Sequence, residues 1–132
     1  MYLLDTDTCI YLINKNPQTV VLRVRGLKPY QVKLSAVSLA ELEYGASKSS
    51  NRERNRSALL RFASAFEILA FDDTDAEVYG LIRAGLERKG RVIGPYDMQI
   101  AAQAIRRDLI LVTNNVDEFR RIPDLRIENW TE

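Results

Sequence analysis

The chain has 132 residues, which suits a single domain with its own hydrophobic core. Apolar residues make up 46% of the sequence and charged residues 28%, a composition that excludes a disordered chain and is typical of a globular protein. The chain contains no histidine, so Ser-His-Asp catalysis, Cys-His catalysis and histidine-bound zinc are excluded, and any hydrolase built from it must use carboxylates.

Charge is unevenly distributed along the chain. Residues 1–66 carry 10 basic and 5 acidic side chains, whereas residues 67–132 carry 9 basic and 13 acidic ones. A basic half can attract phosphate groups, although an unevenly charged solvated surface explains the pattern equally well.

The same sequence predicts a cytoplasmic protein that does not enter a membrane. No apolar run approaches the roughly 18 residues that a membrane-spanning helix needs. The opening segment lacks the basic flank of a signal peptide, and Cys9 has no second cysteine with which to form a disulfide.

The first half of the chain alternates short apolar runs with segments of helical periodicity. Proline at position 17 separates two of the helical segments, and Ser38 followed by Glu41 matches a capping box. The expected elements are a strand over Tyr2–Asp5, a helix over Thr8–Asn14, a helix from Pro17 up to Gly26, a strand over Gln31–Ser35, a helix opened by Ser38, and an amphipathic helix over Arg52–Phe66 with Leu59, Leu60, Phe62 and Phe66 on its inner side.

The second half continues the alternation. A glycine closes one long helical pattern, and a Gly-Pro pair opens the next. The expected elements are a strand over Glu67–Phe71, a helix over Asp75–Lys89 capped by Asp73 or Thr74, a helix after Gly94-Pro95, a strand over Leu109–Thr113, a short helix over Asp117–Arg121 and an edge strand over Arg126–Trp130. Strands that alternate with helices predict one α/β domain, residues 1–132, with a mostly parallel sheet.

Three acids fall where such a sheet binds ligands, which is beyond the carboxyl ends of its strands. Asp5 ends the first strand, Glu41 follows the second strand, and Asp97 lies in the first turn after Gly94-Pro95. A divalent cation relieves the repulsion of clustered carboxylates, activates water and neutralises a phosphodiester. The sequence therefore predicts a metal site for phosphodiester hydrolysis.

Each acid also has a purely structural interpretation. Asp5 can cap the helix that follows it, Glu41 can complete the capping box with Ser38, and Asp97 can complement a helix dipole. Their convergence on one sheet edge is what favours the functional interpretation.

Four segments carry a resemblance that covers Leu3 to Trp130: LLDTDTCIYLI, SLAELEYGA, GPYDMQIAAQA and LVTNNVDEFRRIP. In this order they resemble the motifs of the PIN-domain ribonucleases and, more narrowly, the VapC toxins of bacterial toxin–antitoxin pairs. The resemblance implies a PIN-like three-layer α/β/α sandwich. It also implies an RNA-cleaving site in which Asp5, Glu41 and Asp97 hold Mg²⁺, with Mn²⁺ as a substitute.

The sequence departs from the family pattern at a fourth acidic position. Many relatives carry an acid just after the last core strand, where this chain has the neutral Asn115. Asp117 or Glu118 can take its place, and a surface role suits either equally well. Thr6 and Thr113 can orient carboxylates or bound water through their hydroxyl groups.

The resemblance also suggests a substrate and partners. The segments IGPYDMQIAA and LVTNNVDEF are most similar to the VapC subgroup that cuts initiator tRNA in its anticodon loop. A VapB-type antitoxin and a homodimer are the expected protein partners, with the apolar first two helices and the Arg52–Phe66 helix forming their binding surface. The basic residues expected to hold RNA phosphates are Arg52, Arg54, Arg56, Lys89 and Arg91.

Two other functions remain open at this point. One is a PIN-fold protein that binds RNA or a partner with little catalysis, as the neutral Asn115 suggests. The other is a phosphatase of the haloacid-dehalogenase type, because Asp5-Thr6-Asp7 has the required Asp-x-Asp form.

Tyr96, next to Asp97, can stack on a base, but core packing is the favoured interpretation for it.

Overall fold

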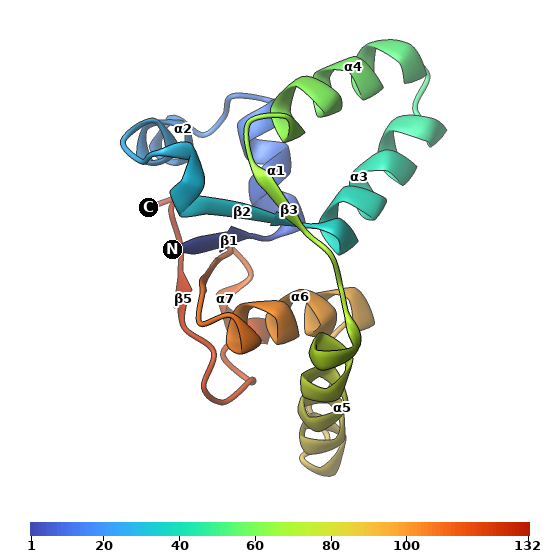
Figure 1. The fold of residues 1–132 in the computed structure, drawn as a ribbon, viewed down its shortest axis with the longest axis vertical. Helices are drawn as coiled ribbons and strands as arrows, with labels where there is room; N and C mark the ends of the chain where they lie inside the picture. Colours follow the sequence, from blue (N-terminus) through green and yellow to red (C-terminus); the bar gives the residue numbers. More distant parts are fainter.

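A computed structural model describes all residues from 1 to 132 and shows a five-stranded sheet with helices on both faces (Figure 1). Every strand pairing is parallel, and the strand order is β3-β2-β1-β4-β5. The predicted three-layer α/β fold is therefore confirmed, with a sheet that is wholly parallel. The strands are β1 (Tyr2–Leu4), β2 (Val32–Ser35), β3 (Glu67–Leu69), β4 (Ile110–Val112) and β5 (Ile127–Glu128).

The helices divide into two groups. Figure 1 shows α1 to α4 on one side of the sheet and α5 to α7 on the other. No helix combines the length and the apolar character needed to cross a membrane. The helices are α1 (Thr6–Ile13), α2 (Gln18–Arg25), the short 3-10 helix η1 (Pro29–Gln31), α3 (Ala36–Lys48), α4 (Arg52–Ala63), α5 (Asp73–Arg88), α6 (Pro95–Arg106) and α7 (Val116–Phe119).

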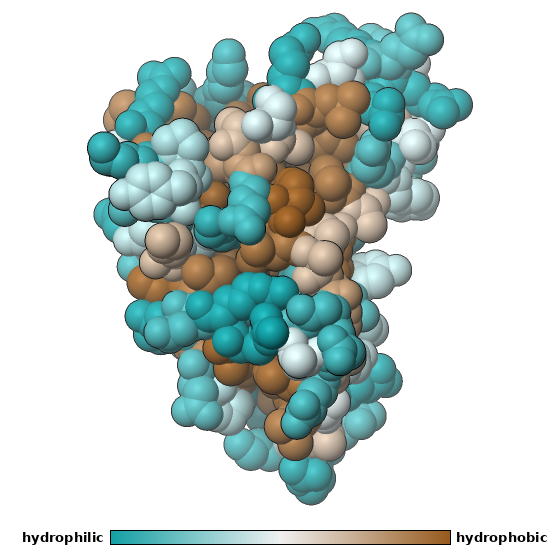
Figure 2. Space-filling view, viewed as in Figure 1, coloured by the Kyte–Doolittle hydropathy of each residue, from teal (hydrophilic) through white to brown (hydrophobic).

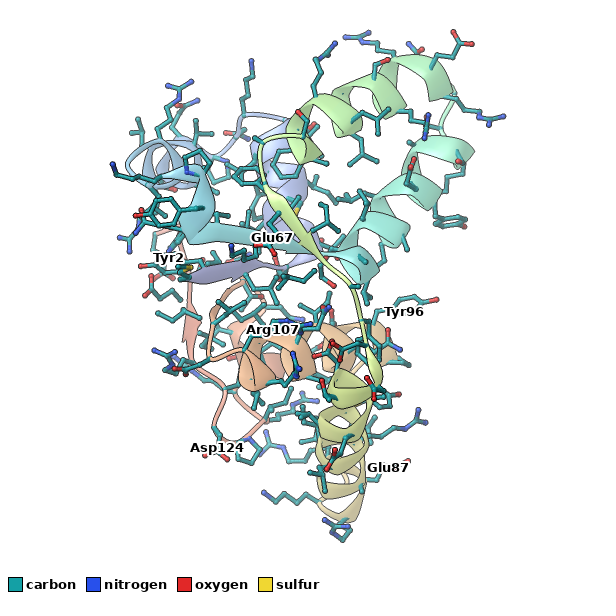
Figure 3. All side chains as sticks on the ribbon, viewed as in Figure 1. Tyr2, Glu67, Glu87, Tyr96, Arg107 and Asp124 are labelled. Atoms are coloured by element: carbon teal, nitrogen blue, oxygen red, sulfur yellow. The ribbon has the colours of Figure 1, made fainter.

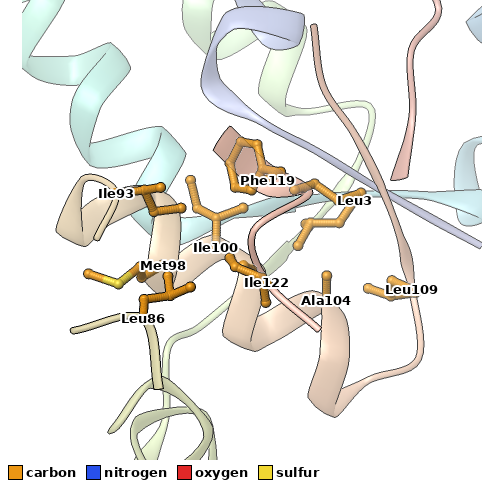
Figure 4. Close-up of a cluster of buried hydrophobic side chains, with 11 residues drawn as sticks. Leu3, Leu86, Ile93, Met98, Ile100, Ala104, Leu109, Phe119 and Ile122 are labelled. Atoms are coloured by element: carbon orange, nitrogen blue, oxygen red, sulfur yellow. The ribbon is translucent and has the colours of Figure 1, made fainter. Parts of the chain in front are cut away.

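Successive residues of the central strand supply two separate cores, because side chains alternate between the faces of a strand. Leu3 joins a cluster with Ile100 of α6 and Phe119 of α7 (Figure 4). Leu4 joins a second cluster on the opposite face with Cys9 and Trp130. Burial on both faces explains why the two central strands, β1 and β4, are continuous apolar runs. The two cores hold the sheet rigid under the residues that follow each strand.

Helix starts differ from the prediction at three places because the capping residues differ. The first helix begins at Thr6, two residues early, because the Asp5 carboxylate accepts a hydrogen bond from the Thr8 amide at 2.8 Å. The third helix is capped by Ser35, so the predicted opening at Ser38 is wrong. The fifth is capped by Asp72, one or two residues before the predicted Asp73 or Thr74.

Other predicted elements are longer than the observed ones. The predicted strands Gln31–Ser35 and Glu67–Phe71 lose terminal residues, the first of them to η1. The helix predicted over Arg52–Phe66 ends at Ala63, and Leu60 is 46% exposed although its spacing predicted an inward position. The residues after Ala63 turn the chain from α4 into β3 instead of extending the helix.

A buried hydrogen-bonded bridge joins β2, β3 and α6. The Ser35 hydroxyl donates to Oε1 of Gln103, and Nε2 of Gln103 donates to the carbonyl oxygens of Leu69 at 3.1 Å and Ala70 at 3.2 Å. Both Ser35 and Gln103 are fully buried. Because Ser35 also caps α3, the bridge fixes the start of α3 relative to α6.

Replacing Gln103 with leucine is expected to lower the free energy of unfolding by about 2 to 3 kcal/mol, because buried polar groups lose their partners. Urea denaturation measures this loss. The matched control is Gln99→Leu, a change to a half-buried glutamine one turn earlier on α6, which should change stability by less than about 0.5 kcal/mol. Equal losses in the two variants would contradict the assigned role of the bridge.

Candidate active site

The Asp5 side chain is fixed at the point where β1 passes into α1. Its carboxylate caps the helix, and its backbone amide donates to the Val112 carbonyl oxygen at 3.0 Å. Only 4% of the residue is exposed. Burial raises the pKa of the Asp5 carboxyl, and hydrogen bonds from Thr113 and Thr8 partly offset the rise. The structural interpretation of Asp5 as a helix cap is therefore correct, and the cap itself holds the carboxylate at the sheet edge.

Glu41 lies on α3 and contacts the element that carries Asp5. The Thr6 hydroxyl donates to Oε1 of Glu41 at 2.7 Å and lies 3.0 Å from the Ser38 hydroxyl. Glu41 and Ser38 therefore share Thr6 as a partner and do not form the predicted capping box. The Thr6 contact connects α1 to α3 and restrains the Glu41 carboxylate beside the loop after β1.

Asp97 is the third residue of α6, and its side chain is half-buried. Burial raises the pKa of the Asp97 carboxyl to about 6, and the negative charges of Glu41 and Asp5 add to the rise. The three predicted acids therefore lie close enough to influence one another, although 92 positions separate the first from the last in the sequence.

The fourth position is occupied by amide and hydroxyl groups. Asn115 precedes α7 without capping it through its side chain, and its backbone amide donates to the Thr113 hydroxyl at 2.9 Å. Of the two alternative acids, Glu118 contributes to the raised pKa of Asp97, as does Asp7. Asp7 lies where many PIN relatives have asparagine, and the sequence predicts for it a supporting position beside the acids or in the loop. Its contribution to the pKa of Asp97 places it near the cluster.

The residues fit a hard divalent cation by their chemistry. The donors are carboxylate oxygens, which Mg²⁺ and Mn²⁺ prefer. Burial is the main cause of the raised pKa of Asp97, and the remaining rise comes from nearby negative charge that a cation would relieve. In this structure, no three acidic or cysteine side chains are close enough to form a ready ligand set. Asp5, Glu41 and Asp97 are the residues predicted to hold a bound cation, and their side chains would have to move closer together to do so.

The basic residues predicted to hold RNA are divided between two ends of the molecule. Arg52, Arg54 and Arg56 lie on the first turns of α4, where Arg56 forms an ion pair with Glu43 at 3.1 Å. Lys89 and Arg91 follow α5, at the opposite end of the protein from α4 (Figure 1). The two groups form no single patch, and their role in RNA binding stays a prediction.

Comparison with known proteins identifies the family. The PIN domain model matches residues 2–125. Ribonuclease VapC2 of Rickettsia felis is 45% identical over 131 residues, which is 98% of each chain. The tRNA(fMet)-specific endonuclease VapC of Salmonella typhimurium is 45% identical over 129 residues, 98% of this chain and 97% of the relative. One chain in the crystal structure of VapBC2 from Rickettsia felis, bound to a DNA fragment from their promoter, is 45% identical and superimposes with a TM-score of 0.92 over 98% of both chains. The fold and these full-length matches, together with the site geometry, show that the chain belongs to the PIN-domain family.

Proposed function

We propose that this protein is a metal-dependent endoribonuclease toxin of a VapBC-type pair, acting in the cytoplasm. The convergence of Asp5, Glu41 and Asp97 at the carboxyl edge of the sheet is the observation that carries the proposal. Full-length relatives at 45% identity are named ribonuclease VapC2 and tRNA(fMet)-specific endonuclease VapC, which supports the same activity. Mg²⁺ is the proposed cofactor, with Mn²⁺ as its substitute.

Different residues of the chain have different roles in the proposed hydrolysis. A divalent cation, when bound, neutralises charge on the phosphodiester and lowers the pKa of the attacking water. Asp5 is held in position by its helix cap, and Glu41 is restrained by the Thr6 hydroxyl. With no histidine in the chain, a carboxylate of this cluster has to accept the proton of the water.

The two competing functions receive less support. The phosphatase hypothesis required Asp5-Thr6-Asp7 to act as a nucleophilic motif, but the Asp5 carboxylate caps a helix and the chain belongs to the PIN family. The non-catalytic hypothesis rested on the neutral Asn115. Glu118, three residues further on, lies near enough to Asp97 to contribute to its raised pKa, so it is the residue we propose in place of the missing fourth acid.

The proposed substrate is initiator tRNA, cut in its anticodon loop. The support is the Salmonella typhimurium relative, whose name specifies tRNA(fMet). An unpaired loop can present one phosphodiester to a shallow acidic site, whereas paired A-form RNA is held too rigidly for this. The basic groups at the two ends of the molecule would then contact the phosphates of the flanking stems.

The proposed protein partner is a VapB-type antitoxin, because the similar structures include VapBC complexes. A groove of about 480 Å³ lies between α1, α3 and α4 and has Ile10, Ile13 and Leu42 in its walls. Thr6 and Glu41 line the same groove, so a helix bound there would reach the acids. Figure 2 shows apolar surface extending from α4 across β3, where Leu60 and Ile68 are exposed.

A homodimer is also part of this proposal. In α2, Val20 and Val21 are buried in the core, but Leu22 is 60% exposed. The helix therefore keeps an apolar position available for contact with a second copy. Sedimentation of the chain alone tests this part of the proposal.

The central experiment is cleavage of total tRNA by the purified chain. Excess EDTA should abolish cleavage, and Mn²⁺ or Mg²⁺ should restore it. Primer extension should map a dominant new end in the anticodon loop of initiator tRNA. Asp97→Asn should lower the cleavage rate by roughly 10²- to 10³-fold while the fold persists, because the substitution removes a charge without changing the shape.

The outcomes separate the activity from the target. Full cleavage in excess chelator would refute the metal mechanism. Cleavage spread over single-stranded mRNA, with intact initiator tRNA, would refute only the substrate. Asp124→Asn removes a charge from an exposed turn and serves as the matched control, with unchanged activity expected.

Asp97→Asn should stabilise the metal-free protein at neutral pH. Because the pKa of Asp97 is raised to about 6, its protonated form favours the native state below pH 4, and that stability is lost as the pH rises through 6. The variant should therefore unfold at higher urea concentration at pH 7.5, by on the order of 1 kcal/mol after solvent screening, and match the wild type at pH 3.5. A variant less stable than the wild type at pH 7.5 would contradict the repulsion between the acids.

Ile10→Glu should weaken antitoxin binding at least tenfold, because it places a charge in the apolar groove between α1 and α4. The measurement is titration with the product of the neighbouring gene. Leu81→Glu on α5 is the control, since Leu81 is 70% exposed and lies outside the groove. Equal affinities for the two variants would place the antitoxin elsewhere.

A further inference from the structure

An apolar hollow of about 740 Å³ opens beside the candidate active site, between α3, α6 and the segment after β3. Seven of its nine lining residues are hydrophobic, and Val37, Tyr44, Phe71 and Tyr96 are among them. Glu41 also lines the hollow, so its interior is continuous with the acid cluster. A ligand in the hollow would touch the same carboxylate that is proposed to act on the phosphodiester.

Two of the lining aromatic side chains are exposed. Tyr96 is 58% exposed, so the core packing favoured for it from the sequence is wrong. Figure 3 shows Tyr96 projecting from the start of α6, away from the body of the protein. Tyr44 is 66% exposed on α3. Neither ring contributes to the cores, yet both stand beside acidic residues of the site.

The polar groups around the hollow suit an RNA base and its phosphate. Gln99 lies three residues after Tyr96, and both residues line the hollow. Its amide can donate and accept hydrogen bonds at a base edge. Nζ of Lys48 lies 4.9 Å from the centroid of the Tyr44 ring and brings a positive charge to this side of α3. Flat apolar walls, one amide and a nearby cation are the features that bind a single unstacked nucleotide.

We propose that this hollow binds one nucleobase of the substrate RNA, next to the cleaved phosphodiester, with the base stacked on Tyr96 and its edge paired with Gln99. The proposal rests on the proposed ribonuclease function and deepens it. Continuity with Glu41 favours a base over a protein segment, because a base is joined covalently to the phosphate that the acids must reach. In this arrangement Tyr96 contributes affinity, because any base can stack on it, and Gln99 is the specificity-determining residue for the nucleotide beside the cut.

The test uses binding of an anticodon stem-loop RNA in which 2-aminopurine replaces each loop base in turn. Asp5→Asn, which keeps a helix-capping side chain, prevents cleavage during the measurement. At one loop position, binding to the Asp5→Asn chain should quench the 2-aminopurine fluorescence. The additional change Tyr96→Phe should leave this quenching intact, and Tyr96→Ala should abolish it. The Kd of Tyr96→Ala should rise about 5- to 100-fold. Tyr30→Ala, at an equally exposed tyrosine outside the hollow, is the control and should bind like the parent.

Three results would overturn the proposal. Unchanged quenching and Kd in Tyr96→Ala, with a wild-type chain that still cleaves RNA, would show that the base lies elsewhere. A shift of Tyr96→Ala from dimer to monomer in sedimentation, with unchanged RNA affinity per chain, would assign the hollow to contact between copies. A wild-type chain that neither binds nor cleaves RNA would refute the proposed function together with this inference. If Tyr96→Ala fails to fold, Tyr96→Leu keeps the apolar volume and gives the same comparison.

Discussion

The carboxylates of Asp5, Glu41 and Asp97 repel one another, and this repulsion adds to the effect of burial in raising the pKa of Asp97. Side chains free to move would relax by turning apart into water. Here the Asp5 carboxylate is tied to the Thr8 amide, and Glu41 is tied to the Thr6 hydroxyl. The fold therefore keeps negative charge concentrated where a cation and a phosphodiester can use it.

The scaffold that resists this repulsion lies directly beneath the acids. Leu3 and Leu4 anchor β1 in two different cores, so the strand that presents Asp5 cannot tilt without disturbing both. The bridge between Ser35 and Gln103 fixes α3 relative to α6, and these two helices carry Glu41 and Asp97. Hydrophobic burial thus supplies the rigidity, and a few buried hydrogen bonds set the spacing.

The sequence predicted the fold class, the alternation of elements and the convergence of three acids at one sheet edge, because periodicity and strand-end position are local signals. Their role in catalysis stays a prediction. It failed where a residue's role depends on distant partners. Ser38 matched a capping box, but Ser35 caps α3 because β2 ends there and Gln103 holds its hydroxyl. Tyr96 was expected in the core, but it lies in the first turn of α6 and is exposed to solvent. Nothing local indicated that Arg52 and Lys89 lie at opposite ends of the protein.

The strand order has a consequence for when the protein becomes active during its synthesis. Of the five strands, β1 is synthesised first and lies at the centre of the sheet, and its second partner is β4, with Tyr2 aligned to Ile110. The Asp5 amide itself is bonded to Val112. Pairing over such a long sequence separation forms late, so a nascent chain cannot assemble the acid cluster until most of its residues have emerged. Asp97 and Val112 both lie late in the sequence, so a chain synthesised only as far as α5 holds Asp5 and Glu41 without the third acid or the β4 partner.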